Sequence, residues 1–204
     1  MAQTIDHLHT GVWSFLDESQ EERITRLYMP KRVSYAGASE ALARMENLLR
    51  YPACGRMLLY GDSDIGKTMI VYKFVPDHPN ICNQFGEVEA RKVLRLQMPS
   101  KPNDGRLYAQ IIDGLGHKAP DTRRGTDLEI LALRLLYQNP PRLMIVDEVH
   151  HLLAGSVREQ RQSLNQLKFL SNELRMPVVA LGTSEALYAM QADPKIASRF
   201  EPFA

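Results

Sequence analysis

The residues best suited to chemistry in this sequence lie in one short glycine-rich segment. The pattern GxxxxGK[ST] is met by GDSDIGKT at residues 61–68. Its two glycines permit a tight turn in which backbone N–H groups point at phosphate oxygens, and a helix starting near Gly66 adds its positive end. Lys67 can reach the β- and γ-phosphates, and the Thr68 hydroxyl can ligate Mg²⁺.

The alternative is a chance glycine and lysine loop, but the segment follows an apolar run and precedes a helical pattern, as phosphate binding requires. The sequence therefore predicts a site for ATP and Mg²⁺. The residues predicted to bind the nucleotide are Gly61, Asp62, Ser63, Asp64, Ile65, Gly66, Lys67, Thr68 and Met69.

Two carboxylates follow the apolar run 143–146, namely Asp147 and Glu148. Ligands of α/β sheets gather at the carboxyl ends of strands, so both acids are expected beside the phosphate-binding segment. We predict that Asp147 holds Mg²⁺, directly or through water, and that Glu148 polarises the water that attacks the γ-phosphate. A strand that simply ends in solvent-facing acids is the alternative, which the upstream segment disfavours.

Further polar residues follow the acids and the next apolar run. His150 and His151 either support the catalytic groups or simply begin a helix. After the run 177–181, we assign γ-phosphate sensing to Thr183 and N-capping of the next helix to Ser184.

Arg199 ends a short helical pattern near the last residues. It could stabilise transition-state charge on the γ-phosphate of a neighbouring subunit. It could equally be a surface arginine at a helix C-terminus, and its position alone does not separate the two.

Strand and helix patterns alternate around these groups. This alternation predicts an α/β fold with a parallel sheet covered on both faces. Ser39 is the expected N-cap of the second helix. The predicted strands are 56–60, 92–98, 143–146 and 177–181, and the predicted helices are 19–28, 38–50, 66–72, 107–115, 127–137, 160–174 and 184–191.

Composition restricts the class of protein. The net charge is +1, so any nucleic-acid contact must come from a local patch. The sequence shows no signal-peptide pattern and no apolar run long enough to span a membrane. Two cysteines without metal-ligand spacing are typical of reduced thiols, and a cytoplasmic location is expected.

The ordered motifs resemble those of AAA+ ATPases, which have the P-loop NTPase fold, a three-layer αβα sandwich with a central parallel sheet. The sequence around the motifs is more similar still to that of the TniB/TnsC family of bacterial transposition ATPases, which are relatives of the phage Mu target-selection protein. The similar stretches are GDSDIGKTMI, LMIVDEVHHLL, VVALGTSEAL and IASRFEPF, and the resemblance runs from about residue 20 to the last residue.

The resemblance implies roles for individual residues. Lys67 and Thr68 match Walker A, Asp147 and Glu148 match Walker B, Thr183 matches sensor 1, and Arg199 matches the arginine finger that acts in trans. Family members form ATP-dependent rings or helical filaments on duplex DNA and recruit a transposase with a target-selector protein. Slow, assembly-dependent ATP hydrolysis disassembles them.

DNA contacts in relatives lie on two loops. One follows the second strand, and the other precedes the helix that leads to Walker B. Phosphate contact suits the residue types found there, although each could be an ordinary solvated charge. The corresponding residues are Lys101, Arg106, Thr122, Arg123 and Arg124. We expect residues 1–35 to be an N-terminal extension and residues 36–204 the AAA+ domain, with the helical lid missing.

Three alternatives remain. One is an AAA+ DNA ATPase of another system, such as a replication loader or a secretion-linked ATPase. Another is a nucleotide-gated scaffold with negligible turnover, which Glu148 disfavours. A small-molecule kinase is disfavoured because no basic lid or acceptor-site pattern is visible.

Overall fold

The computed structural model describes most of the chain. The described residues are 19–28, 35–51, 55–63, 65–85, 88–100, 104–121, 124–191 and 200–204. Contacts divide the chain into two units, Met1–Ser34 and Tyr35–Ala204. None of the described helices has the length and hydrophobicity needed to cross a bilayer.

The first unit contains helix α1 (Gln20–Tyr28). Its start has a capping box, because Ser19 Oγ accepts from the Glu22 N–H at 3.3 Å and Glu22 Oε2 accepts from the Ser19 N–H at 2.8 Å. Donation to the Glu22 carboxylate from the Ser19 backbone N–H, and secondly from the Ser19 hydroxyl at 2.8 Å, lowers the pKa of Glu22.

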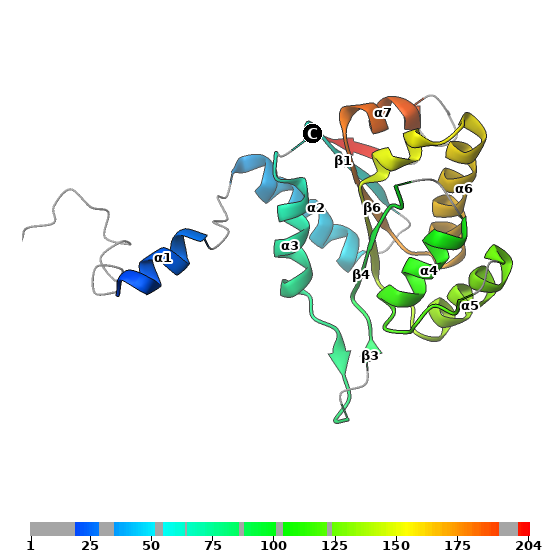
Figure 1. Cartoon of the computed structure of the whole chain (residues 1–204), viewed down its shortest axis with the longest axis horizontal. Helices are drawn as coiled ribbons and strands as arrows, with labels where there is room; N and C mark the ends of the chain where they lie inside the picture. The colour runs from blue at the N-terminus through cyan, green and yellow to red at the C-terminus, as the bar shows by residue number, and fades with distance from the viewer. Residues whose placement is uncertain are drawn as a thin grey trace, which may run out of the picture. The chain divides into compact units, whose positions relative to one another are not determined.

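The second unit is built on a five-stranded parallel sheet with the order β4-β5-β6-β1-β7 (Figure 1). Consecutive residues of the three central strands, β5, β6 and β1, are buried, which explains their largely apolar sequences. The strands are β1 (Arg56–Tyr60), β4 (Val93–Gln97), β5 (Leu143–Asp147), β6 (Val178–Gly182) and β7 (Glu201–Phe203). A separate antiparallel pair consists of β2 (Ile81–Cys82) and β3 (Val88–Ala90).

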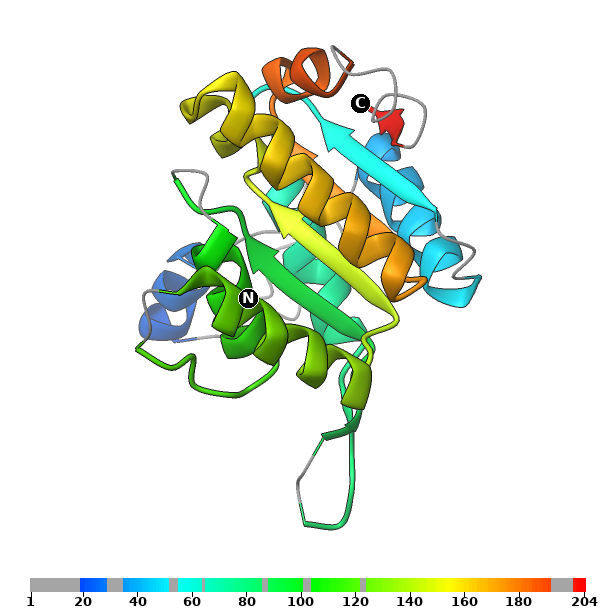
Figure 2. The ribbon, with the colours of Figure 1, turned by 90° about the vertical axis from the view of Figure 1, so that its right-hand side faces the viewer.

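Helices cover both faces of the sheet, as Figure 1 shows, and Figure 2 views the face covered by α4, α5 and α6. On one face lie α2 (Ala36–Arg50) and α3 (Lys67–Asp77); on the other lie α4 (Asp104–Gly114), α5 (Gly125–Gln138) and α6 (Val157–Glu173). The 3-10 helix η2 (Val149–Ala154) follows β5, and α7 (Ser184–Gln191) follows β6.

Strand β5 shows how one strand serves two cores. Leu143 and Ile145 pack with residues of α2 and α3, whereas Met144 and Val146 pack with residues of α4, α5 and α6. The alternation follows from the two-residue period of a strand. It fixes the register of the strand, and with it the position of Asp147 at its carboxyl end.

The structure confirms the predicted strands and helices, with ends that differ by up to five residues. One prediction was wrong: α2 begins at Ala36, with Tyr35 as N-cap, so Ser39 lies inside the helix and does not cap it. The apolar positions of the helix, including Ala38 and Ala41, already face the core from its first turn, and packing sets its start.

Candidate active site

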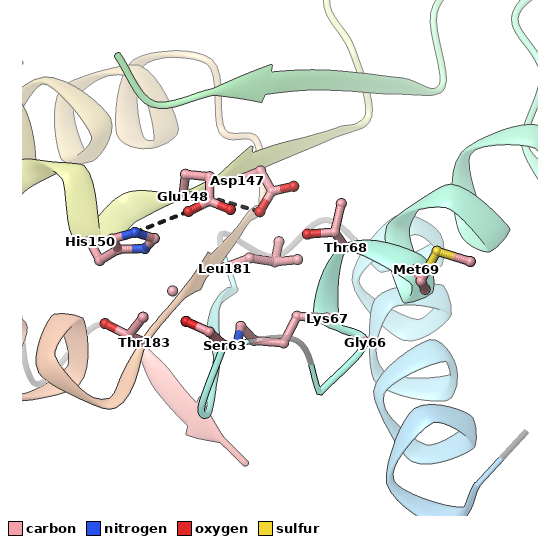
Figure 3. Close-up of a pocket in the computed structure, with 11 residues that line it drawn as sticks. Ser63, Gly66, Lys67, Thr68, Met69, Asp147, Glu148, His150, Leu181 and Thr183 are labelled. Carbon is pink, nitrogen blue, oxygen red and sulfur yellow. Dashed lines mark hydrogen bonds and ion pairs between the residues drawn. The ribbon is translucent and has the colours of Figure 1, made fainter. Parts of the chain in front are cut away.

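A cavity of about 260 Å³ lies at the carboxyl ends of β1, β5 and β6 (Figure 3). Three segments that are distant in sequence meet there: the glycine-rich loop, the acids after β5, and the end of β6. Its lining residues are Ser63, Gly66, Lys67, Thr68, Met69, Asp147, Glu148, His150, Leu181, Gly182 and Thr183.

The glycine-rich loop ends in a left-handed residue. Gly66 has φ +94° and precedes the first residue of α3, so the chain enters the helix through a conformation that favours glycine. The first N–H groups of α3 have no partner within the helix, which makes this end suited to an anion. Tyr35, which the sequence did not single out, donates its hydroxyl to Ile65 O at 3.2 Å and holds the loop from outside.

Lys67 is folded back onto its own loop. Its Nζ donates to Gly61 O at 3.0 Å and to Asp62 O at 2.5 Å. The ammonium group therefore already lies within the loop that would surround a phosphate. Thr68 and Met69, in the first turn of α3, also line the cavity.

Asp147 is 4% exposed and its carboxylate has two partners. Oδ1 accepts from the Glu148 N–H at 2.9 Å, and Oδ2 lies 3.4 Å from Arg95 Nη2. The Arg95 guanidinium stacks 4.3 Å from the centre of the Tyr72 ring. Sequence analysis did not identify this arginine, because a single cation inside a strand pattern does not reveal which carboxylate it reaches.

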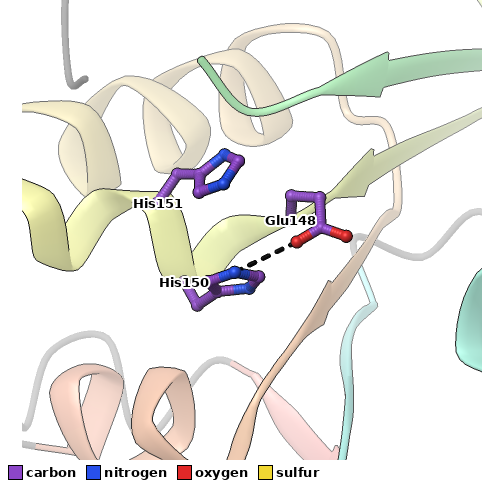
Figure 4. A group of neighbouring side chains, drawn as sticks. All are labelled: Glu148, His150 and His151. Carbon is purple, nitrogen blue, oxygen red and sulfur yellow. Dashed lines mark ion pairs between the residues drawn. The ribbon is translucent and has the colours of Figure 1, made fainter. Parts of the chain in front are cut away.

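Glu148 is held in an unusual backbone conformation, with φ +59° for a residue that is not glycine. Its Oε2 lies 3.1 Å from His150 Nε2 (Figure 4). His151, by contrast, does not line the cavity, and its Nδ1 is 2.9 Å from Met98 O. Of the two histidines, His150 is therefore the one that reaches a predicted catalytic group.

Thr183 lines the cavity, and its hydroxyl oxygen is buried with no hydrogen-bond partner among the described residues. The predicted cap at Ser184 was wrong, because Ser184 is the first residue of α7. The residue before the helix is Thr183, whose carbonyl accepts from the N–H groups of Ala186 and Leu187.

The cavity residues fit a magnesium nucleotide. A buried hydroxyl without a partner, an ammonium group on carbonyl oxygens and a buried carboxylate are groups that phosphate oxygens and Mg²⁺ would engage. Thr68 and Asp147 face the same space in Figure 3.

Two of the predicted DNA-contacting residues are described by the structure, and neither lines the cavity. Arg106 is exposed in the first turn of α4, and Arg124 is exposed at the N-cap of α5. The starts of these helices are adjacent, because a Cβ on Gly125 would lie 3.6 Å from Gly105 N. Several predicted site residues lie outside the described residues: Asp64, Lys101, Thr122, Arg123 and Arg199.

Comparison with known families matches the chain to the bacterial TniB protein family over residues 23–204. The chain belongs to the TniB family. This assignment covers every part of the cavity described above. A comparison with curated proteins gave no significant match.

Solved structures share the fold of this TniB family member. That fold is the AAA+ type of the P-loop fold. Aeropyrum pernix ORC2 in ADPNP and ADP complexes is 21% identical, with a TM-score of 0.60 over 86% of this chain and 48% of that chain. Aeropyrum pernix ORC1 in complex with DNA is 17% identical, with a TM-score of 0.61 over 87% and 47%. Drosophila ORC bound to DNA is 18% identical, with a TM-score of 0.56 over 85% and 43%. The chain thus spans about half the length of these proteins.

Proposed function

We propose that this chain binds ATP with Mg²⁺ in the cavity and hydrolyses it to ADP and phosphate. The observation that carries the proposal is the meeting of Lys67, the carboxylates of Asp147 and Glu148, and the unpaired hydroxyl of Thr183 in one cavity. A phosphate-binding loop alone would suit any nucleotide-binding protein, whereas a second carboxylate suits activation of water.

Each residue has a distinct role in this proposal. Lys67 turns from the loop carbonyls to the β- and γ-phosphates, and Thr68 and Asp147 hold Mg²⁺. Mg²⁺ bound there would neutralise charge that develops on the phosphates. Glu148 accepts a hydrogen bond from the attacking water, and Thr183 donates its hydroxyl to the γ-phosphate.

The remaining loop residues and a neighbouring subunit complete the site. Backbone N–H groups of the loop, from Asp62 through Ser63, Asp64 and Ile65 to Gly66, surround the phosphates, and Met69 borders the nucleotide. Arg199 of an adjacent copy reaches the γ-phosphate, so turnover depends on assembly.

The biological reaction that we propose is control of transposition. The ATP-bound chain assembles on target duplex DNA as a ring or filament, recruits a transposase and a target-selector protein, and disassembles on hydrolysis. Membership of the TniB family supports this reading. Residues 36–204 would form the ATPase domain, with residues 1–35 as an extension, in the cytoplasm of a bacterium.

DNA contact would come from the loops before α4 and α5. The exposed arginines Arg106 and Arg124 belong to adjacent helix starts, which suits contact with successive phosphates. The proposal also includes DNA contact by Lys101, Thr122 and Arg123, as the resemblance to the family implies. With a net charge of +1 per chain, binding needs several subunits together and weakens with salt.

A scaffold that binds ATP with negligible turnover is the second candidate. It is favoured by the present partners of the two carboxylates, because Asp147 is paired with Arg95 and Glu148 with His150. The Asp147–Arg95 pair must open or adjust before Mg²⁺ can bind to this carboxylate. Phosphate release from the wild-type chain on DNA separates this candidate from the hydrolase.

The first experiment is duplex-DNA binding by fluorescence anisotropy with ATP, ADP or no nucleotide, at low and moderate salt. We expect ATP-dependent binding that Lys67→Ala abolishes. Arg124→Ala should weaken binding several-fold and reduce the salt slope by about 1. Arg134→Ala, an exposed arginine further along α5, is the matched control and should bind normally. Equal binding in every nucleotide state would contradict ATP gating.

A further inference from the structure

His150 has one ring nitrogen paired and the other unpaired. Its Nε2 lies 3.1 Å from Glu148 Oε2, whereas its Nδ1 is buried with no hydrogen-bond partner among the described residues. If Nε2–H donates to the carboxylate, Nδ1 carries a free lone pair. Buried polar atoms are rarely left unpaired, so this nitrogen calls for an explanation.

A second unpaired atom belongs to the same cavity. Thr183 Oγ1 is also buried without a partner, and both residues line the cavity in Figure 3. The strand end and η2 are in close contact, because a Cβ on Gly182 would lie 2.8 Å from Val149 Cγ2 and 3.7 Å from His150 N. No side chain at position 182 separates the end of β6 from the histidine.

The Glu148 carboxylate depends on few contacts for its direction. The residue has φ +59°, and its N–H donates to Asp147 Oδ1 at 2.9 Å. Its side chain is about one-third exposed. Among the described residues, its carboxylate has one polar contact, with His150, so the imidazole restricts where that carboxylate points (Figure 4).

We propose that His150 is a positioning residue that aims the Glu148 carboxylate and couples it to Thr183. The proposal rests on the ATP hydrolysis proposed above. Nε2–H holds one carboxylate oxygen, which leaves the other to accept a hydrogen bond from the attacking water. Because η2 contacts the end of β6, a change in the partner of the Thr183 hydroxyl on phosphate binding is transmitted to the imidazole.

Steady-state phosphate release with duplex DNA, together with binding of a fluorescent ATP analogue, tests the positioning role. His150→Ala should lower kcat by about 10–100-fold, while KM and the Kd of the analogue change by less than about threefold. His150→Gln retains a donor that can reach the carboxylate and should recover most of kcat. A merely structural histidine would not give rescue by glutamine at unchanged affinity.

The matched control is His78→Ala, because His78 Nε2 pairs with Glu46 Oε1 at 2.7 Å, at the end of α3 remote from the loop. Its kcat should equal that of the wild type. Unchanged kcat in His150→Ala would overturn the proposal. If the alanine variant does not fold, His150→Leu, which preserves bulk and removes the donor, should show the same loss and is compared with His150→Gln.

A double-mutant cycle tests the coupling to Thr183. Independent residues would multiply their losses in kcat, whereas coupled residues lose less together. We expect the His150→Ala, Thr183→Val double variant to be no more than about threefold slower than the slower single variant. Losses that multiply would overturn the coupling. A wild-type chain that binds the analogue but releases no phosphate would overturn the proposed hydrolysis, and with it the positioning role that rests on it.

Discussion

Two histidine–carboxylate pairs lie in different regions of the same domain, and they differ in how completely each ring is used. At the far end of α3, His78 binds Glu46 through Nε2, contacts Phe74 O at 2.8 Å through Nδ1 and packs on the Phe74 ring. At the cavity, His150 pairs with Glu148 and leaves Nδ1 unpaired.

The difference separates stability from function. The His78 side chain is 13% exposed and both of its nitrogens have partners, as expected of a residue that holds helices together. The cavity side keeps unpaired polar atoms on His150 and Thr183, although satisfying them would stabilise the protein. The two unpaired atoms that lie in the cavity are available to a ligand that could complete them.

The largest effect on nucleotide binding should come from Lys67→Ala, which removes the ammonium group from the cavity. We expect affinity for ATP to fall by at least about 100-fold, because two or more charge-assisted hydrogen bonds to phosphate are lost. Titration of a fluorescent ATP analogue measures it. Lys73→Ala, on the same helix but outside the cavity, should bind normally; equal losses in both variants would contradict the site.

Thr183→Val should have the next largest effect. We expect it to act in opposite directions on thermal stability and on turnover. Removing an unpaired buried hydroxyl should leave the Tm of the nucleotide-free protein unchanged or raise it by a few degrees. The same change should lower kcat by about 10-fold or more, since the γ-phosphate loses a donor. A fall in Tm without loss of turnover would assign the hydroxyl to stability.

His78→Ala and His150→Ala sharpen the contrast by thermal unfolding. Loss of the His78 contacts should lower Tm by about 4–8 °C, as a few broken interactions do in a domain of this size. His150→Ala should shift Tm by less than about 2 °C, because its ring is only partly engaged. Equal shifts would remove the distinction drawn between the two pairs.

At Ser156, the N-cap of α6, we expect an effect on stability alone that is smaller than that of His78→Ala. Ser156 Oγ accepts from the Glu159 N–H at 3.4 Å, and Glu159 Oε2 accepts from the Ser156 N–H at 2.7 Å. Ser156→Ala should lower Tm by about 2–4 °C with no change in turnover. A change in kcat would show that α6 is coupled to the cavity.

The same cap predicts a pH dependence. Hydrogen bonds from the Ser156 hydroxyl, and secondly from its backbone N–H, lower the pKa of Glu159 below its usual 4.5. A carboxylate with a lowered pKa contributes stability that is present above its usual pKa and is lost as pH falls through the lowered one. Tm of the wild type and of Ser156→Ala should therefore converge in acid, and a constant gap down to low pH would contradict this.

Much of the fold could be predicted because its signals are local. The run before Asp147 is apolar on both faces, and the spacing of Gly61, Gly66 and Lys67 defines a phosphate loop without knowledge of the tertiary structure. The β2–β3 pair was not predicted, since strands of two and three residues leave no periodic pattern.

The contacts that adjust the site could not be predicted, because they depend on where side chains point across the fold. Arg95 reaches Asp147 from the neighbouring strand, and Tyr35 reaches the loop from the start of α2. His150 could be suspected from its position, but only the geometry distinguishes it from His151.

The measurement that tests the central claim most directly is phosphate release by the wild-type chain and Glu148→Gln, with Mg²⁺, ATP and duplex DNA. We predict turnover by the wild type and a loss of about 10²–10⁴-fold in the variant, because a general base is removed. Binding of the ATP analogue should be retained in both. Release that is absent in the wild type, or equal in the two proteins, would contradict hydrolysis at this cavity.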